Sequence, residues 1–220
     1  MTDKKYSFTT FSRITEPAGA KVVYIHGGHE NREEIFEKID GSNFALVFIE
    51  GLDWNADTTP WPAKGVFGGS DFGGKAKDYL KILEEEIIPG AEKSLGLTNP
   101  ARAIAGYSLG GLLSIYALVE TELFTGAASV SGSLWYDGFV DFVKENTEKI
   151  KADRVYFSLG DKERKTKNPR MAAVQQATEE IHSVFKTLCP HTIFELNPGN
   201  HFVDAEKRLA AGLNYIVSEE

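Results

Sequence analysis

Short, mostly apolar runs alternate with segments of helical spacing along this chain. Continuous apolar runs of strand length are typical of parallel strands that are buried on both faces of a sheet. The runs predicted to be such strands are 22–25, 44–49, 103–105, 126–131, 154–159 and 192–196. Apolar residues spaced three and four apart, which line one face of a helix, predict helices over 32–39, 76–88, 109–119 and 171–188. The alternation predicts an α/β fold with a doubly wound, mostly parallel sheet and helices on both faces.

Two further stretches add to this plan. Residues 6–14 alternate aromatic or aliphatic residues with polar ones, which predicts a half-exposed antiparallel strand at an edge of the sheet. Pro89 and Gly90 are expected to end the helix that begins at Ala76, because proline removes a backbone donor. In a doubly wound sheet, ligands bind beyond the carboxyl ends of the strands, so we expect the chemistry in the loops that follow them.

The segment 51–74 has no periodicity and holds six Gly, two Pro and several aromatic residues. A loop of this length in a compact domain is usually a lid or a binding loop, so we expect it to lie over the site. A loop packed on itself is the alternative. Trp61, held between two prolines, is the substrate contact expected here, and Tyr107 and Trp135 are the others.

Composition narrows the class of protein. The chain of 220 residues is 42% apolar and has no Pro/Ser-rich or charged linker, so we expect one domain over 1–220. No stretch resembles a signal peptide or is long enough to span a bilayer, and the single cysteine, Cys189, has no partner for an internal disulfide. These features favour a cytoplasmic protein. A net charge of −8 argues against nucleic-acid and anionic-membrane partners and leaves a small molecule as the expected partner.

The strongest chemical signal is Gly106-Tyr107-Ser108-Leu109-Gly110, between a predicted strand and a predicted helix. At such an elbow the serine is held in a strained conformation that exposes its hydroxyl, and the glycines provide clearance. Ser108 is therefore the predicted nucleophile. The backbone N–H of Leu109 lies in the first helical turn and is the predicted oxyanion donor.

A second glycine-rich turn follows the strand at 22–25 and reads His26-Gly27-Gly28-His29. In α/β-hydrolases a loop at this place supplies the second oxyanion donor, which we assign to Gly28. A tight turn with no catalytic part is the alternative.

A base and an acid follow Ser108 at the ends of later strands. His201 lies in a turn-rich loop after the last predicted strand, and Asp161 and Glu163 follow the strand at 154–159. The order serine, acid, histidine is that of α/β-hydrolases. We assign His201 as the base and Glu163 as the acid, because an Asp directly after a strand-end glycine commonly caps the turn. Asp161 is the alternative acid.

The chain resembles the putative esterase family within the α/β-hydrolases, which includes esterase D-like, feruloyl and siderophore esterases. The motifs that carry the resemblance are Gly106-Tyr107-Ser108-Leu109-Gly110-Gly111, Ser129-Val130-Ser131-Gly132-Ser133-Leu134-Trp135, Glu86-Ile87-Ile88-Pro89 and Gly199-Asn200-His201. The resemblance implies hydrolysis of a carboxylic ester through an acyl-enzyme, without a cofactor, and leaves the substrate open. Many relatives carry a single Asp at the acid position, and some siderophore esterases work without an acid.

Other functions fit parts of the sequence. A thioesterase or acyltransferase would use the same triad, and an inactive binding protein would share the fold. Residues 69–76 nearly match a phosphate-binding loop, but Ala76 stands where Mg²⁺ binding needs Ser or Thr. His26, His29 and Glu30 could suggest a metal site, yet the histidines lie in a glycine-rich turn without a further ligand cluster, so we expect no metal.

Overall fold

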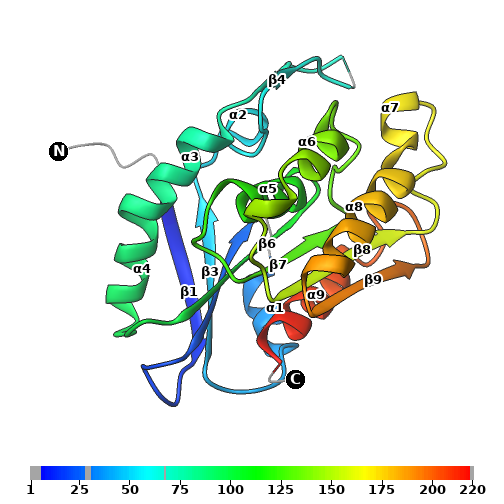
Figure 1. Cartoon of the computed structure of the whole chain (residues 1–220). Coiled ribbons are helices and arrows are strands. Elements are labelled where there is room, and N and C mark those ends of the chain that lie inside the picture. The colour runs from blue at the N-terminus through cyan, green and yellow to red at the C-terminus, as the bar shows by residue number, and fades with distance from the viewer. Residues whose placement is uncertain (1–5, 28–30, 67, 219–220) are drawn as a thin grey trace.

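The computed structural model describes residues 6–27, 31–66 and 68–218. Within these residues the main sheet has the strand order β1-β3-β2-β6-β7-β8-β9, and all neighbouring strands are parallel except β1 and β3 (Figure 1). The strands are β1 (Ser7–Arg13), β2 (Lys21–His26), β3 (Phe44–Glu50), β6 (Ala101–Tyr107), β7 (Gly126–Val130), β8 (Arg154–Gly160) and β9 (His191–Asn197). The predicted mostly parallel sheet and its antiparallel edge strand are confirmed.

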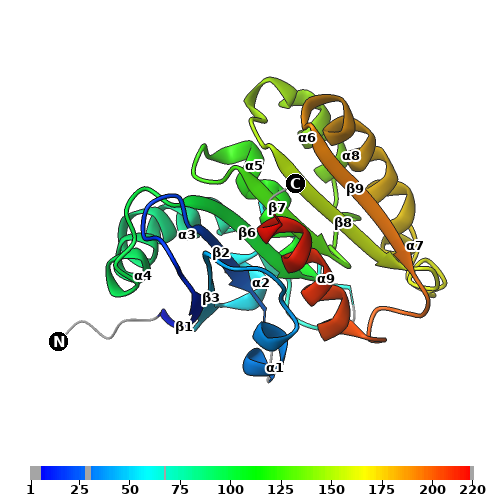
Figure 2. The same ribbon diagram turned by 90° about the horizontal axis from the view of Figure 1, so that it is seen from below.

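Helices cover both faces of this sheet, as predicted. One face carries α3 (Ala76–Ile82), α4 (Ile88–Ser94), α5 (Leu109–Glu120), α6 (Phe139–Glu145) and α8 (Val174–Leu188). The other face carries α1 (Arg32–Glu37) and α9 (Ala205–Val217), which lie next to each other in the view from below (Figure 2).

Strand β2 shows why the buried strands are apolar throughout. Val22 and Tyr24 pack in the core under α3 to α8, whereas Val23 and Ile25 pack in the core under α1 and α9. Alternate side chains of a strand point to opposite faces. In a strand that is covered on both sides, every position is therefore buried and favours an apolar residue.

The helix that begins at Ala76 does not end at Pro89, which corrects the sequence prediction. A π-helical turn (Leu83–Ile87) leads directly into α4, where Pro89 occupies the first turn. In an ordinary helix the proline ring clashes with the preceding turn and one hydrogen bond is lost, whereas the first residues of a helix need no backbone donor. The wider π-turn therefore lets the chain continue in the same direction through the proline.

One other helical prediction needs adjustment, and two helices were not predicted. The predicted helix 171–188 is divided at Ala173 into α7 (Pro169–Ala172) and α8, and the side chain of Asn168 caps α7. The sequence prediction assigned neither α6 nor α9. The latter is an amphipathic helix whose buried residues include Leu209, Leu213 and Ile216.

The segment 51–74 contains more regular structure than its sequence predicts. It forms α2 (Trp54–Asp57) and a hairpin of β4 (Pro62–Ala63) and β5 (Phe72–Gly73). Asp57 is buried and accepts hydrogen bonds from the Asp53 N–H and the Tyr6 hydroxyl, at 2.8 and 3.0 Å. These bonds hold α2 and connect it to Tyr6, the residue before β1. Its role as a lid remains a prediction.

Candidate active site

Ser108 joins β6 to α5 in a sharp turn with φ 60° and ψ −120°. A residue other than glycine rarely adopts this conformation, and such strain is typical of functional sites. A Cβ atom at Gly106 would lie 2.4 Å from the Gly110 carbonyl carbon, and one at Gly110 would lie 2.3 Å from the His26 carbonyl oxygen. Both glycines are therefore required for the turn to pack against its neighbours.

His201 lies between Ser108 and Glu163. The Ser108 Oγ is 3.2 Å from His201 Nε2, and His201 Nδ1 is 2.7 Å from Glu163 Oε2. Because an ionised carboxylate can only accept hydrogen bonds, the hydrogen bond network assigns the proton to Nδ1 and leaves the lone pair of Nε2 facing the serine. The three side chains come from the loops that follow β6, β8 and β9 and converge at the carboxyl ends of these strands.

The second carboxylate oxygen of Glu163 is fully engaged. Oε1 accepts hydrogen bonds from the Gly160 N–H and the Ser131 hydroxyl, both at 2.7 Å, and from Arg208 Nη1 at 3.0 Å. Burial alone would raise the pKa of this carboxyl, but hydrogen bonds from His201, Gly160 and Ser131 lower it to about 2. Glu163 therefore stays ionised at neutral pH although its side chain is only 4% exposed.

Asp161 has a different partner. Its Oδ1 accepts a hydrogen bond from the Gly199 N–H at 2.8 Å, and its own N–H donates to the Asn197 carbonyl at 2.7 Å. These bonds join the turn after β8 to the loop after β9. The structure thus places Glu163 against the histidine and uses Asp161 to connect two loops.

One of the two predicted oxyanion donors, the N–H of Leu109, lies beside Ser108. Leu109 is the first residue of α5, so its N–H has no partner inside the helix and lies next to Ser108 at the positive end of the helix dipole. Gly28 lies outside the described residues. Its neighbour Gly27 is described and lines the cavity at Ser108.

A cavity of about 340 Å³ opens at Ser108. Its described lining includes Tyr107, one of the predicted substrate contacts, and Trp54, one of the aromatic residues of the 51–74 segment that was expected to be a binding loop. It also includes Phe202, which the sequence analysis did not single out. Phe202 is 84% exposed and directly follows His201. Aromatic rings therefore share the described lining of this cavity with Ser108 and His201.

Trp61 does not belong to the described lining of this cavity. Its ring packs with Tyr136, Phe139 and Phe142 at centroid distances of 5.5 to 6.4 Å, and its Nε1 donates to the Asp137 carbonyl at 3.0 Å. The ring of Trp61 thus packs the 51–74 segment against α6. Its predicted contact with a substrate has no support from this geometry.

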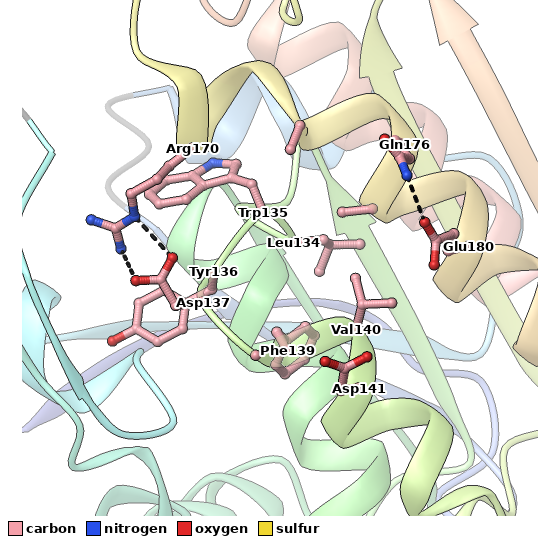
Figure 3. A pocket seen from close by; sticks show the side chains of 13 residues that line it. Leu134, Trp135, Tyr136, Asp137, Phe139, Val140, Asp141, Arg170, Gln176 and Glu180 are labelled. Atoms are coloured by element: carbon pink, nitrogen blue, oxygen red, sulfur yellow. Dashed lines mark hydrogen bonds and ion pairs between the residues drawn. The ribbon is translucent and has the colours of Figure 1, made fainter.

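Trp135 lines a second cavity, of about 430 Å³, between α6 and α8. Figure 3 shows the guanidinium of Arg170 against the indole ring of Trp135 and paired with Asp137. The described lining of this cavity does not include Ser108 or His201. The two cavities are nevertheless linked by a short stretch of chain. Ser133 lies two residues before Trp135, and its Oγ is 3.5 Å from the Ser108 Oγ.

The sequence analysis also missed Arg208, which is 2% exposed and contacts Glu163. The spacing of Leu209, Leu213 and Ile216 could have revealed the helix. An arginine on the apolar face of that helix would then have indicated a buried partner. Phe202 had no comparable signal, because its place at the cavity depends on how distant segments pack.

Among the described residues there is no cluster of three or more side chains suited to hold a metal ion. Of the proposed metal ligands, His26 is buried and bonds to the Tyr79 hydroxyl through Nε2 at 2.8 Å, while His29 and Glu30 lie outside the described residues. No helix in the described part of the chain is long and apolar enough to cross a membrane.

Comparison with known proteins gives concordant results. Residues 18–214 match the family described as "Putative esterase". The uncharacterized protein YbbA of Bacillus subtilis (strain 168) is 28% identical over 186 residues, which cover 80% of this chain and 74% of that protein.

Among solved structures, an IroE-like serine hydrolase from Shewanella oneidensis superposes with a TM-score of 0.78 at 17% identity, covering 94% of this chain and 74% of that one. The siderophore hydrolase EstA from Aspergillus nidulans gives 0.76 at 16% identity and 96% and 89% coverage. The BES protein from Bacillus cereus gives 0.73 at 20% identity and 96% and 90% coverage. At these identities the likeness shows a common fold.

Proposed function

Because the chain belongs to the putative esterase family of ester hydrolases, we propose that it cleaves a small-molecule carboxylic ester through an acyl-enzyme on Ser108. The observation that carries this proposal is the pair of hydrogen bonds made by His201. Its Nδ1 donates to Glu163 at 2.7 Å, and its Nε2 accepts from the Ser108 hydroxyl at 3.2 Å. A serine hydroxyl is a weak nucleophile until an adjacent base takes its proton, and a third group must hold that base in the correct tautomer.

In the first half of the reaction, Ser108 Oγ attacks the ester carbonyl carbon while His201 Nε2 takes the hydroxyl proton. The carbonyl π electrons move onto the oxygen, which the Leu109 N–H stabilises. Glu163 remains ionised and stabilises the imidazolium. When the tetrahedral intermediate collapses, the bond to the alcohol oxygen breaks and His201 returns the proton to the leaving alkoxide.

In the second half, a water molecule attacks the acyl-enzyme and His201 acts first as base and then as acid again. The acid product leaves and Ser108 regains its proton, so no external oxidant, reductant or cofactor is needed. A thioester would follow the same path with a thiolate as leaving group, and in an acyltransferase an alcohol would replace water.

The cavity at Ser108 supports an uncharged group next to the reacting carbonyl. Its described lining contains the aromatic side chains of Trp54, Tyr107 and Phe202 and no Lys or Arg. Of the similar structures, one is named a siderophore hydrolase and another a ferulic acid esterase, so esters of these kinds belong in a substrate panel. The three-residue relay argues against a protein that only binds, since binding alone would not need a base aligned with a strained serine.

Labelling and hydrolysis together test this proposal. A fluorophosphonate should label the wild-type protein at Ser108, as mapped by mass spectrometry, and Ser108→Ala should lose both labelling and about 10⁴-fold or more in kcat. The assay uses p-nitrophenyl esters of increasing chain length together with feruloyl and catecholate esters and matching thioesters. Full activity of Ser108→Ala, or labelling at another residue, contradicts the proposal.

A further inference from the structure

Arg208 on α9 is 2% exposed. It bonds to two members of the proposed relay, which consists of Ser108, His201 and Glu163: the Glu163 carboxylate and the His201 backbone. Burying a guanidinium in a protein is costly unless its donors are paired with good geometry. Nη1 donates to Glu163 Oε1 at 3.0 Å and to the Ser131 Oγ at 2.7 Å. Nη2 donates to the carbonyl oxygens of Asn200 and His201, both at 3.2 Å. One side chain thus links the acid to the backbone that carries the base.

Tyr107 extends this link to the nucleophile. Its hydroxyl accepts a hydrogen bond from Arg208 Nη2 and donates one to the His201 carbonyl. Burial raises the pKa of Tyr107, so the hydroxyl keeps the proton that this bond needs. Tyr107 directly precedes Ser108, and its ring lies 5.3 Å from the imidazole ring of His201. Arg208 therefore bonds to Glu163, to the backbone of His201 and to Tyr107, the residue before Ser108.

We propose that Arg208 is a positioning residue for the hydrolysis. It holds the Glu163 carboxylate and the His201 backbone in fixed relation, so the hydrogen bond that orients the imidazole is already formed in the free enzyme. This inference rests on the proposed function of Ser108, His201 and Glu163.

The geometry of the guanidinium suits this task. Its planar fork has fixed donor directions, so two nitrogens can bind two acceptors at once without loss of orientation. A lysine has one nitrogen on a flexible stem and cannot hold the carboxylate and the two carbonyls together. Ser131 has φ 46°, a strained value for serine, and its hydroxyl lies between Arg208 and Glu163. The acid is thus enclosed by groups whose own positions are constrained, as precise orientation requires.

The test is a double-mutant cycle. We compare Arg208→Met in the wild-type and Glu163→Gln backgrounds, with Arg208→Lys as the conservative variant. Hydrolysis of a p-nitrophenyl ester is measured below the melting temperature of every variant. We expect Arg208→Met to lower kcat by about 10²-fold with KM within about threefold, and Arg208→Lys to recover about tenfold of that loss. In the Glu163→Gln background, Arg208→Met should lower kcat by less than about threefold, since the carboxylate that Arg208 orients is already absent.

The double variant replaces a buried ion pair with two neutral side chains and is expected to fold. If Arg208→Met alone does not fold, Arg208→Lys carries the test, with an expected tenfold fall in kcat at nearly unchanged KM. Wild-type kcat in either Arg208 variant, or an equal loss from Arg208→Met in the two backgrounds, overturns the inference. Ser108→Ala in the same assay separates the two proposals, because a fully active Ser108→Ala contradicts the nucleophile itself.

Discussion

After β8, Asp161 and Glu163 accept hydrogen bonds from different parts of the molecule, His201 for Glu163 and the Gly199 N–H for Asp161. We expect Glu163→Gln to lower kcat by about 10² to 10⁴-fold, because a neutral amide cannot stabilise the imidazolium. It should also lower the free energy of unfolding by about 3 kcal/mol, since Arg208 is left as a buried cation without its counter-charge.

Asp161→Asn is the matched control. Its kcat should stay within about threefold of wild type, and its free energy of unfolding should fall by about 1 kcal/mol as the bond to Gly199 weakens. Steady-state kinetics and urea unfolding measure both quantities. An inactive Asp161→Asn beside a fully active Glu163→Gln would reverse the assignment of the acid.

The backbone at Ser108 gives a prediction about stability. A non-glycine residue in such a conformation costs about 1 to 3 kcal/mol, whereas glycine adopts it without strain. Glycine also makes the unfolded chain more flexible, which offsets about 0.5 to 1 kcal/mol. We therefore expect Ser108→Gly to have a free energy of unfolding about 1 kcal/mol higher than that of Ser108→Ala, as measured by urea unfolding. Both variants lack the hydroxyl, so a less stable Ser108→Gly would mean that the turn is not strained.

At the scale of elements, the hairpin of the 51–74 segment is attached to α7. Arg170 Nη1 donates to the Lys64 carbonyl at 2.6 Å, and Asn168 Nδ2 donates to the Val66 carbonyl at 3.0 Å. The other end of the segment, α2, lies at the cavity through Trp54. The segment therefore has one part that is fixed to the scaffold and another part at the substrate cavity.

This division predicts different effects for two tryptophans of the segment. Trp54→Ala should change the ranking of p-nitrophenyl esters by chain length, because its ring lines the Ser108 cavity. Trp61→Ala should lower the melting temperature and leave the ranking unchanged, because its ring fills an aromatic cluster with α6. Kinetics over the ester panel and thermal unfolding distinguish the two. A changed ranking in Trp61→Ala with an unchanged one in Trp54→Ala would restore Trp61 as the substrate contact.

Periodicity predicted most elements of this fold because each strand and each long helix buries a whole face. It failed at Pro89, where a π-helical turn accommodates a residue that normally ends a helix. The pattern along the chain carries no signal for such a local change of helix geometry. The apolar residues of α9 also have helical spacing, but the sequence analysis did not predict this helix.

At the scale of the whole molecule, the order of the motifs predicted which loops meet. Ser108, Glu163 and His201 follow parallel strands, and parallel strands bring their carboxyl ends to one edge of the sheet. The environment of these residues could not be predicted in the same way. Arg208 reaches Glu163 only because α9 crosses the face below β6, β7 and β8, and that crossing depends on packing over the full sheet.

The stability of the whole fold in acid depends on a buried histidine. His26 is fully buried at the end of β2, and burial lowers its pKa to about 4, whereas an imidazole in the unfolded chain has a pKa of about 6.5. Between these two values the unfolded state binds a proton that the folded state excludes. The contribution of neutral His26 to the free energy of unfolding is therefore fully present above pH 6.5. It is lost as the pH decreases toward 4, and the loss is about 3 kcal/mol in total.

Glu163 acts in a lower window. Its pKa is depressed to about 2, so its contribution is present above the unfolded value of about 4.3 and is lost only as the pH falls toward 2. The free energy of unfolding of the wild type, measured with urea at pH 7, 6, 5 and 4.5, should therefore decrease because of His26 and not because of Glu163. His26→Gln keeps a polar partner for Tyr79 without a titrating group and should flatten this pH dependence. His182→Gln, the control on α8, should keep most of it, since His182 is only partly buried. Equal slopes for the wild type and His26→Gln would show that the acid sensitivity of this fold originates elsewhere.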